Sequence, residues 1–109
     1  MSWSIVFRYV FQSKIAPLPV VITKAKRYFY MRCRELMKKF GSSFDFEASK
    51  DSWVRKISNI IERTGKREGS HQVARVEMFL DVVQMGSKYM LNVSEIRVIF
   101  YEKVNVVIV

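Results

Sequence analysis

The sequence predicts an α+β protein in which two helices pack on one face of a mainly antiparallel sheet. Three stretches support this fold class. Apolar side chains recur at every second position in residues 3–11 and 73–82, and every three to four positions in residues 20–40. The first spacing is typical of strands and the second of helices. Because the two helical stretches are consecutive, we expect the order β-α-α-β-β-β, with a fourth C-terminal strand as an extension.

The first predicted strand has one strongly apolar side. Its members are Trp3, Ile5, Phe7, Tyr9 and Phe11. Residues 13–19 follow with two prolines two positions apart. Proline fixes φ and removes a backbone donor, so this stretch suits an extended connector better than a helix or a central strand.

The first helix is predicted over residues 20–40. Gly41 follows where a C-terminal cap belongs, and Lys38 and Lys39 suit the negative end of the helix dipole. Its apolar face is Val21, Ala25, Tyr28, Phe29, Arg32 or Cys33, Leu36 and Phe40.

A second helix is predicted to begin near Ser49 or Asp51, because either side chain can cap free amides. It ends at Gly65, and a charged turn follows over residues 66–70. Its expected buried face is Trp53, Ile57, Ile60 and Ile61.

The remaining residues predict strands. Residues 73–82 alternate between an apolar and a mostly polar side, and residues 85–88, with Gly86, suit a hairpin turn. Residues 89–93 would return as a short strand. Residues 96–100 and 104–109 would finish the chain as one long strand or as a hairpin. The last stretch is apolar on both sides, so it is either central in the sheet or covered by another chain.

The charge is one-sided and unevenly spread. We expect one domain over residues 1–109, in which 19 Lys and Arg against 10 Asp and Glu leave a net charge of +9. A basic β-α-α half (1–67) carries 15 of these cations and 5 acids, and an apolar, β-rich half (68–109) carries 4 and 5. Such a charge attracts polyanions, of which nucleic acid is the commonest.

The first helix is the best candidate for a polyanion site, because it has many cations and Glu35 as its one acid. Like charges one helical turn apart repel each other, and surface helices usually reduce this repulsion with acids at neighbouring positions. This helix has almost no such acids. Tyr28 and Tyr30 would add base stacking if they are exposed. The second helix and the turn after it hold a second, more diluted cluster, and the two would merge if the helices present their cations side by side. The predicted nucleic-acid-binding residues are Lys24, Lys26, Arg27, Arg34, Lys38, Lys39, Arg55, Lys56, Arg63, Lys66 and Arg67.

No catalytic constellation is visible in the sequence, so we expect neither an enzyme nor a cofactor or metal. Cys33 is the one cysteine and His71 the one histidine, which leaves no set of zinc ligands. We expect Cys33 to be a buried small hydrophobe, although flanking arginines would lower its pKa if it were exposed. The acids at 45, 47 and 51 suit either a helix start or a divalent ion.

Two classes of function remain. The first is a small non-enzymatic protein that binds nucleic acid, with RNA favoured over DNA. The alternative is a protein–protein interaction, an assembly or accessory subunit or an inhibitor, which uses apolar strands and basic helices. A homodimer or a peripheral membrane contact stays open, and no apolar run approaches the length of a transmembrane helix. A lone cysteine and the lack of a persuasive secretory signal favour an intracellular location, with cytoplasm, mitochondrion and nucleus all open.

Overall fold

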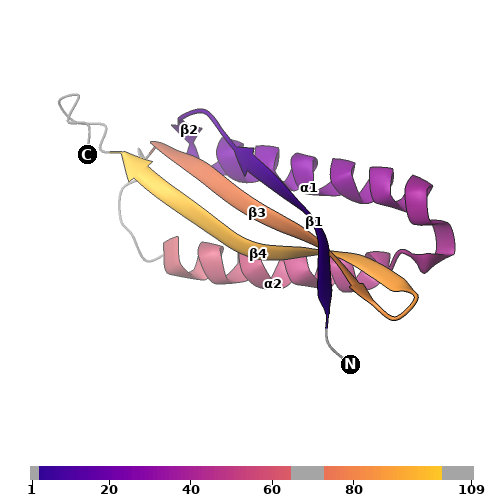
Figure 1. Ribbon diagram of the computed structural model, residues 1–109. Coiled ribbons are helices and arrows are strands. Elements are labelled where there is room, and N and C mark those ends of the chain that lie inside the picture. The colour runs from indigo at the N-terminus through magenta and orange to yellow at the C-terminus, as the bar shows by residue number, and fades with distance from the viewer. Residues whose placement is uncertain (1–2, 65–72, 102–109) are drawn as a thin grey trace.

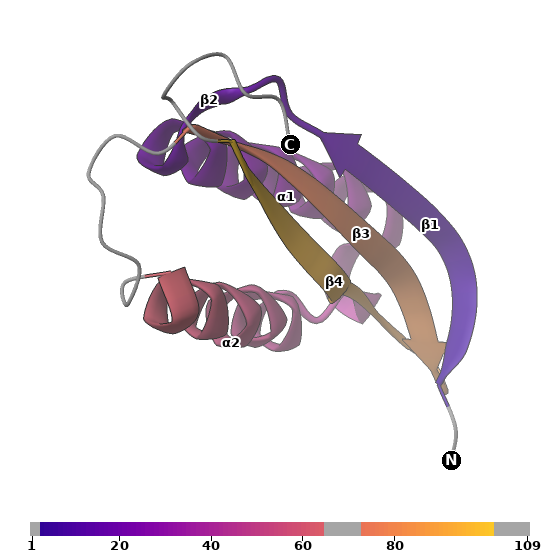
Figure 2. The ribbon, with the colours of Figure 1, turned by 90° about the vertical axis from the view of Figure 1, so that its left-hand side faces the viewer.

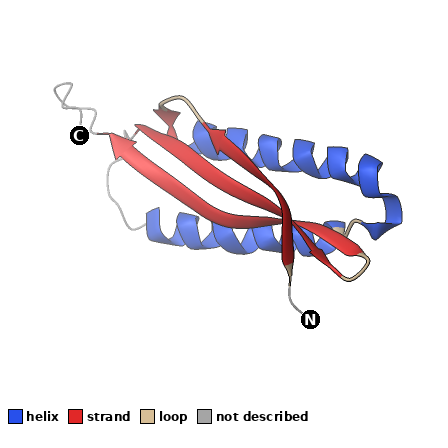
Figure 3. Ribbon diagram, in the orientation of Figure 1, coloured by secondary structure: helices blue, strands red, loops and turns tan. Residues whose placement is uncertain are grey.

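The computed structural model describes residues 3–64 and 73–101. Two helices cover one face of an antiparallel sheet (Figure 1 and Figure 3), which confirms the predicted α+β fold class. The elements are β1 (Ser4–Gln12), β2 (Ala16–Pro17), α1 (Leu18–Phe40), a short 3-10 turn (Gly41–Ser43), α2 (Phe46–Thr64), β3 (Val73–Met85) and β4 (Lys88–Tyr101). Neither α1 nor α2, the helices of the described ranges, is long and apolar enough to cross a membrane.

β3 is the central strand. β4 pairs with one side of β3, and β1 and then β2 pair with the other. Ser13 bridges the break between β1 and β2, since its backbone N–H donates to the Val76 carbonyl at 2.9 Å and its Oγ accepts the Val76 N–H at 2.9 Å. One edge of the sheet is therefore a nearly continuous strand that stays bonded to β3 through the break.

The core lies between the sheet and the two helices. The alternate β3 residues from Ala74 to Val82 are buried against the helices, as predicted. On the helix side, α1 contributes Val21, Ala25 and Phe29, and the ring of Phe29 stacks on that of Trp53 from α2, with centroids 5.6 Å apart. This aromatic contact joins the two helices over the middle of the sheet.

The predicted apolar side of the first strand is only half right. Ile5 pairs with Val83 and Phe7 with Val82, so the register shifts at this point. The shift moves Ile5 to the opposite side of the sheet from Phe7. Tyr9 and Phe11 pack against the core, whereas Trp3, Ile5 and Phe7 are 47%, 61% and 56% exposed.

Both helices begin earlier than predicted. Pro17 and Pro19 do not delay α1, because the first-turn amides of a helix have no intrahelical partner in any case. Asp45 caps α2, where its Oδ1 accepts the Ala48 N–H at 3.0 Å, so Ser49 and Asp51 lie inside the helix. At the end of α1, Gly41 has φ 58°, as predicted for a C-terminal glycine.

Other details of the prediction change or fall outside the described residues. Ile61, predicted to be buried, is 56% exposed, because it lies at the border between the buried and the solvent-facing sides of α2. β4 runs unbroken from Lys88 to Tyr101 and absorbs Ser94 as a bulge opposite Phe79. The predicted turn at Gly86, where φ is 62°, is confirmed. The expected helix end at residue 65, the charged turn and the strand over 104–109 are outside the described ranges.

α2 and its capping residue seal the outer edge of β4 over residues 89–93. The Ser49 hydroxyl accepts the Leu91 N–H at 2.9 Å, and the Ser52 hydroxyl accepts the Val93 N–H at 2.8 Å. Both serines are buried, with 0% and 1% exposure. Asp45 continues the seal, since its N–H donates to the Tyr89 carbonyl at 2.7 Å. Figure 2 shows the result, with α2 lying beyond β4 and α1 behind β3.

Candidate nucleic-acid interface

The solvent face of α1 carries a row of exposed cations, which we call the α1 basic row: Lys24, Arg27, Arg34 and Lys38. These residues lie opposite the buried face of the helix because α1 keeps its core contacts at three-to-four spacing. At 1.5 Å per residue the row extends about 21 Å along the helix. A nucleic-acid strand advances about 3.4 Å per phosphate, so the row covers roughly six phosphates.

No acid within residues 3–64 and 73–101 forms an ion pair with the α1 basic row. Glu35 is the one acid of α1, and its carboxylate accepts a hydrogen bond from Arg32 at 2.8 Å. Arg32 is half-buried, and its guanidinium lies 4.4 Å from the Tyr9 ring centroid and 5.0 Å from that of Tyr28. The hydrogen bond to Glu35 is the main reason that the pKa of Arg32 is raised. Among the described residues, the four members of the row make no ion pair, side-chain hydrogen bond or cation–π contact.

Lys26 and Lys39 flank the row on opposite sides. Both are exposed. Lys39 lies on the side of β1, where it lines a hollow with Phe7 and Tyr9 and its Nζ is 5.6 Å from the Phe40 ring centroid. Lys26 falls on the other shoulder of α1, toward α2, by the 100° helical spacing. Both can join a ligand that already lies along the row.

The second predicted cluster lies elsewhere. Lys56 and Arg63 line a hollow with Ser94 and Glu95 of β4. Arg55 is on the same helix and lines a hollow with Trp3, Val83 and Met90. These three cations therefore lie on the side of α2 that faces β4, away from α1, so the described part of the second cluster does not join the α1 basic row. The remaining members, Lys66 and Arg67, are outside the described residues.

Tyr28 and Tyr30 do not meet the condition for base stacking, because neither side chain is exposed. The ring of Tyr28 lies 4.8 Å from that of Phe11. Tyr30 packs edge-on against Phe29 at 5.3 Å, and burial raises its pKa. Both tyrosines belong to the packing of α1, so the row offers charge alone.

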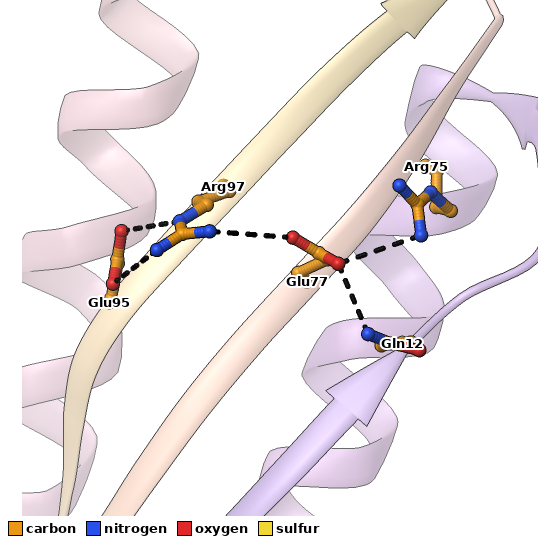
Figure 4. Close-up of polar contacts among 5 residues, drawn as sticks. All are labelled: Gln12, Arg75, Glu77, Glu95 and Arg97. Carbon is orange, nitrogen blue, oxygen red and sulfur yellow. Dashed lines mark hydrogen bonds and ion pairs between the residues drawn. The ribbon is translucent and has the colours of Figure 1, made fainter.

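The face of the sheet away from the helices is also charged, but its charges are paired (Figure 4). Glu77 accepts a hydrogen bond from Gln12 at 3.1 Å and lies 3.5 Å from Arg75 and 3.8 Å from Arg97. Arg97 also donates to Glu95 at 2.6 Å. Sequence reasoning missed this network, because it depends on the register that sets Glu77 opposite both Gln12 and Arg97.

A second pair on this face joins β1 to β3. Arg8 Nε donates to Asp81 Oδ1 at 2.8 Å, and the Asp81 side chain is 7% exposed. The hydrogen bond to Asp81 raises the pKa of Arg8. The cations of the described strands are thus mostly held by acids, unlike those of the α1 basic row.

Cys33, His71 and the acids near the start of α2 were the candidates for reactivity or metal binding. Cys33 is buried as predicted, and burial raises the pKa of its thiol to about 12, so the thiol stays protonated at neutral pH. No group of three His, Cys, Asp or Glu side chains within 3–64 and 73–101 lies close enough to hold a metal ion. Asp45 acts as a helix cap, and His71 is outside the described part of the chain.

Comparisons with known proteins add no relative. No protein-family model, no curated protein and no solved structure matches this chain. The fold and the surface therefore define the class by themselves: an α+β protein with an uncompensated basic helix on one layer and a sheet whose charges are paired.

Proposed function

We propose that this protein binds nucleic acid through the phosphate backbone, with the α1 basic row as its main contact surface. The observation that carries the proposal is that these four exposed cations lie on one helix face without a described acid partner. Each phosphate that a cation neutralises releases condensed counterions, and this release favours binding.

Excess charge that served solubility alone would not need this arrangement. A helix with like charges one turn apart repels itself, and nearby acids relieve the repulsion at little cost. This chain places acids beside the cations of its strands, as Glu77 and Asp81 show, but leaves the α1 basic row bare. The contrast favours a surface that is kept for an anionic partner.

The proposed role is binding without catalysis and without a cofactor. Lysine and arginine contacts to phosphate position a nucleic acid but read no bases, so we expect weak sequence preference. RNA remains the predicted preference, with DNA as the comparison. We expect Arg55, Lys56 and Arg63 to add less to the affinity, because each lines a hollow that also holds an acid. Glu95 lines the hollow of Lys56 and Arg63, and Asp51 lines that of Arg55.

The alternative, a protein-interaction or assembly subunit, has its own observation. β1 leaves Ile5, Val6, Phe7 and Val10 at least 50% exposed, which is much apolar surface for one strand. The two functions differ in salt response. Binding to phosphates weakens steeply with salt, whereas an apolar contact tolerates it.

Fluorescence anisotropy with short labelled RNA and DNA, single- and double-stranded, tests the proposal over a range of salt. Four phosphate contacts predict a slope of log affinity against log salt of about −3 on single strands and about −4 on duplex DNA. Arg27→Ala/Arg34→Ala should weaken binding at least about tenfold and reduce the slope by about 1.4 on single strands. The matched control is Arg55→Ala/Arg63→Ala, which also removes two exposed arginine side chains, but from α2 instead of α1.

We expect the control to keep most of the affinity. Equal losses in the two double variants would show that net charge matters and the α1 basic row does not. Absence of binding at low salt by the folded wild-type protein would overturn the proposed function.

A further inference from the structure

The two edge strands of the sheet, β1 and β4, have different surroundings. β1 is the edge whose outer backbone groups have no described partner strand. Within residues 3–64 and 73–101, β1 pairs with β3 on one side and with no strand on the other. Hydrogen-bonded pairs alternate along an antiparallel ladder, and Ser13 bonds Val76. The backbone groups of Arg8, Val10 and Gln12 therefore face away from β3, toward solvent.

β1 lacks most of the devices that keep edge strands from pairing. Proteins protect edges with lysine, proline, a covering helix or a bulge. Ser4–Gln12 contains no proline and one charge, Arg8, which is held by Asp81 at 2.8 Å. The register shift near Val6 disturbs only the start of the strand, so residues 7–12 form a regular, mostly apolar edge.

We propose that two copies of this chain pair antiparallel through residues 7–12 of β1. The paired sheet has the strand order β4-β3-β1-β1-β3-β4. A second copy is the fitting partner, because it presents an already ordered strand with the same apolar side chains, so no segment must fold on binding. The other edge is less available for pairing, because Ser49 and Ser52 of α2 take up the amides of Leu91 and Val93 in each copy.

Side-chain chemistry selects the register of this pairing. Arg8 opposite Arg8 would set like charges together, which is unfavourable in a directly opposed pair. Moving the two-fold axis to Tyr9 places Tyr9 opposite its copy and Phe7 opposite Phe11, so the pairs are aromatic on the helix side of the sheet. Aromatic pairs are among the more stabilising cross-strand pairs, so this is the register that we propose.

The pairing brings the two basic helices onto one surface. The two-fold axis of an antiparallel edge pair is perpendicular to the sheet, so both copies of α1 lie on the same face. α1 already lies under β1 in each copy, where Tyr28 contacts Phe11 and Arg32 lies 4.4 Å from the Tyr9 ring centroid. This part of the inference rests on the proposed function, since it doubles the surface offered to nucleic acid.

The dimer should respond to salt in the opposite sense from nucleic-acid binding. Two α1 basic rows on one face repel each other, and salt screens that repulsion. We therefore expect salt to strengthen the dimer and to weaken the complex with nucleic acid. By linkage, a nucleic acid that spans both rows also strengthens the dimer.

Analytical ultracentrifugation of the full chain over a concentration series, at low and high salt, measures the dimer directly. Val10→Lys puts a charge on the open edge and should weaken dimerisation at least about tenfold. Ile61→Lys is the matched control, because it adds the same charge at a side chain that is also apolar and 56% exposed, against 50% for Val10. It should leave the dimer unchanged, and circular dichroism checks the fold of both variants.

Cysteine cross-linking tests the register, because Cys33 is buried and leaves a new thiol as the reactive one. Tyr9→Cys should oxidise to a disulfide dimer faster than Val10→Cys, since directly opposed residues in a non-hydrogen-bonded pair lie about 4.5 Å apart at Cα.

A wild-type protein that stays monomeric at every concentration and salt would overturn this inference, while the anisotropy experiment above would still decide the proposed function. Equal weakening by Val10→Lys and Ile61→Lys would overturn it as well. A chain that dimerises only after residues 104–109 are deleted would show that its own C-terminal segment covers β1.

Discussion

The two edges of the sheet show two ways of ending it. β4 ends against α2, where two buried serine hydroxyls take up the amides of Leu91 and Val93. β1 ends in solvent among the described residues, with apolar side chains such as Ile5 and Val10 exposed beside it. The chain thus uses two buried serines to bond the backbone amides of one edge. The other edge has no such contacts among the described residues, so the two edges differ within the same sheet. We read the difference as a division between an edge that closes the fold and an edge that is available for pairing.

The charges of the molecule divide in the same way. On the open face of the sheet, acids hold the cations of the strands, as in the contacts of Arg97 with Glu77 and Glu95. On α1, the one acid is taken by Arg32, and the basic row stays bare. The paired charges hold neighbouring strands of the sheet together. The unpaired charges of the α1 basic row have no described partner, so their side chains can contact an anionic ligand. The largest expected effects on stability are at the edge of β4 that α2 seals.

Removing the seal of β4 should have the largest effect on stability. Ser49→Ala and Ser52→Ala each leave a buried amide without an acceptor, and such a loss costs about 1–3 kcal/mol of the free energy of unfolding. The two serines are one helical turn apart, so the double variant measures their coupling as the departure from the sum of the single losses. Urea unfolding followed by circular dichroism measures them.

Ser58→Ala is the control for this experiment, because it makes the same change at an exposed position of the same helix. Alanine raises helix propensity equally in all three variants, so the difference from the control isolates the buried hydrogen bond. We expect Ser58→Ala to lie within about 0.5 kcal/mol of wild type. If Ser49→Ala and Ser52→Ala matched it, the hydroxyls would not be what closes this edge.

The seal also shows why the fold was more predictable than its details. Spacing alone predicted the two helices and the strand from residue 73, because burial on one side imposes a period of two or of three to four. Gly86 predicted the turn, because glycine adopts positive φ readily. The role of Ser49 was misjudged as a helix start, since nothing in local sequence says that its hydroxyl meets an amide 42 residues away. The shift near Val6 was missed for a similar reason, because a bulge follows from pairing with β3.

Hydrogen exchange should distinguish the two edges amide by amide. The amides of Leu91 and Val93 are bonded to serine hydroxyls, whereas those of Val10 and Gln12 face solvent in a single copy. At low protein concentration, we expect the first pair to exchange at least about 100-fold more slowly than the second, by NMR. Raising the concentration should protect the Val10 amide through the proposed β1 pairing. Strong protection of Val10 in a dilute, monomeric sample would contradict the open edge.

The candidate site was predictable in part. The solvent face of α1 follows from helical spacing, so the members of its basic row could be chosen from sequence. The separation of the two clusters could not, because Lys56 and Arg63 lie beside β4 only once α2 is seated against that strand. The half-buried state of Tyr28 likewise depends on Phe11, which comes from β1.

The smallest effect should be the pH dependence of the open sheet face. The hydrogen bond from Arg97 lowers the pKa of Glu95 from its ordinary value of 4.5. A carboxyl whose pKa is lowered on folding stabilises the protein above its unfolded value, and the contribution is lost as pH falls through the folded value. Glu95→Gln should therefore lower the melting temperature slightly at pH 7, since both partners are exposed, and the difference from wild type should vanish as pH falls below 4.5. Glu62→Gln removes an exposed carboxylate without a described partner, so its melting temperature should stay close to that of wild type at each pH. A Glu95→Gln difference that persisted in acid would mean that the side chain acts through packing instead of charge.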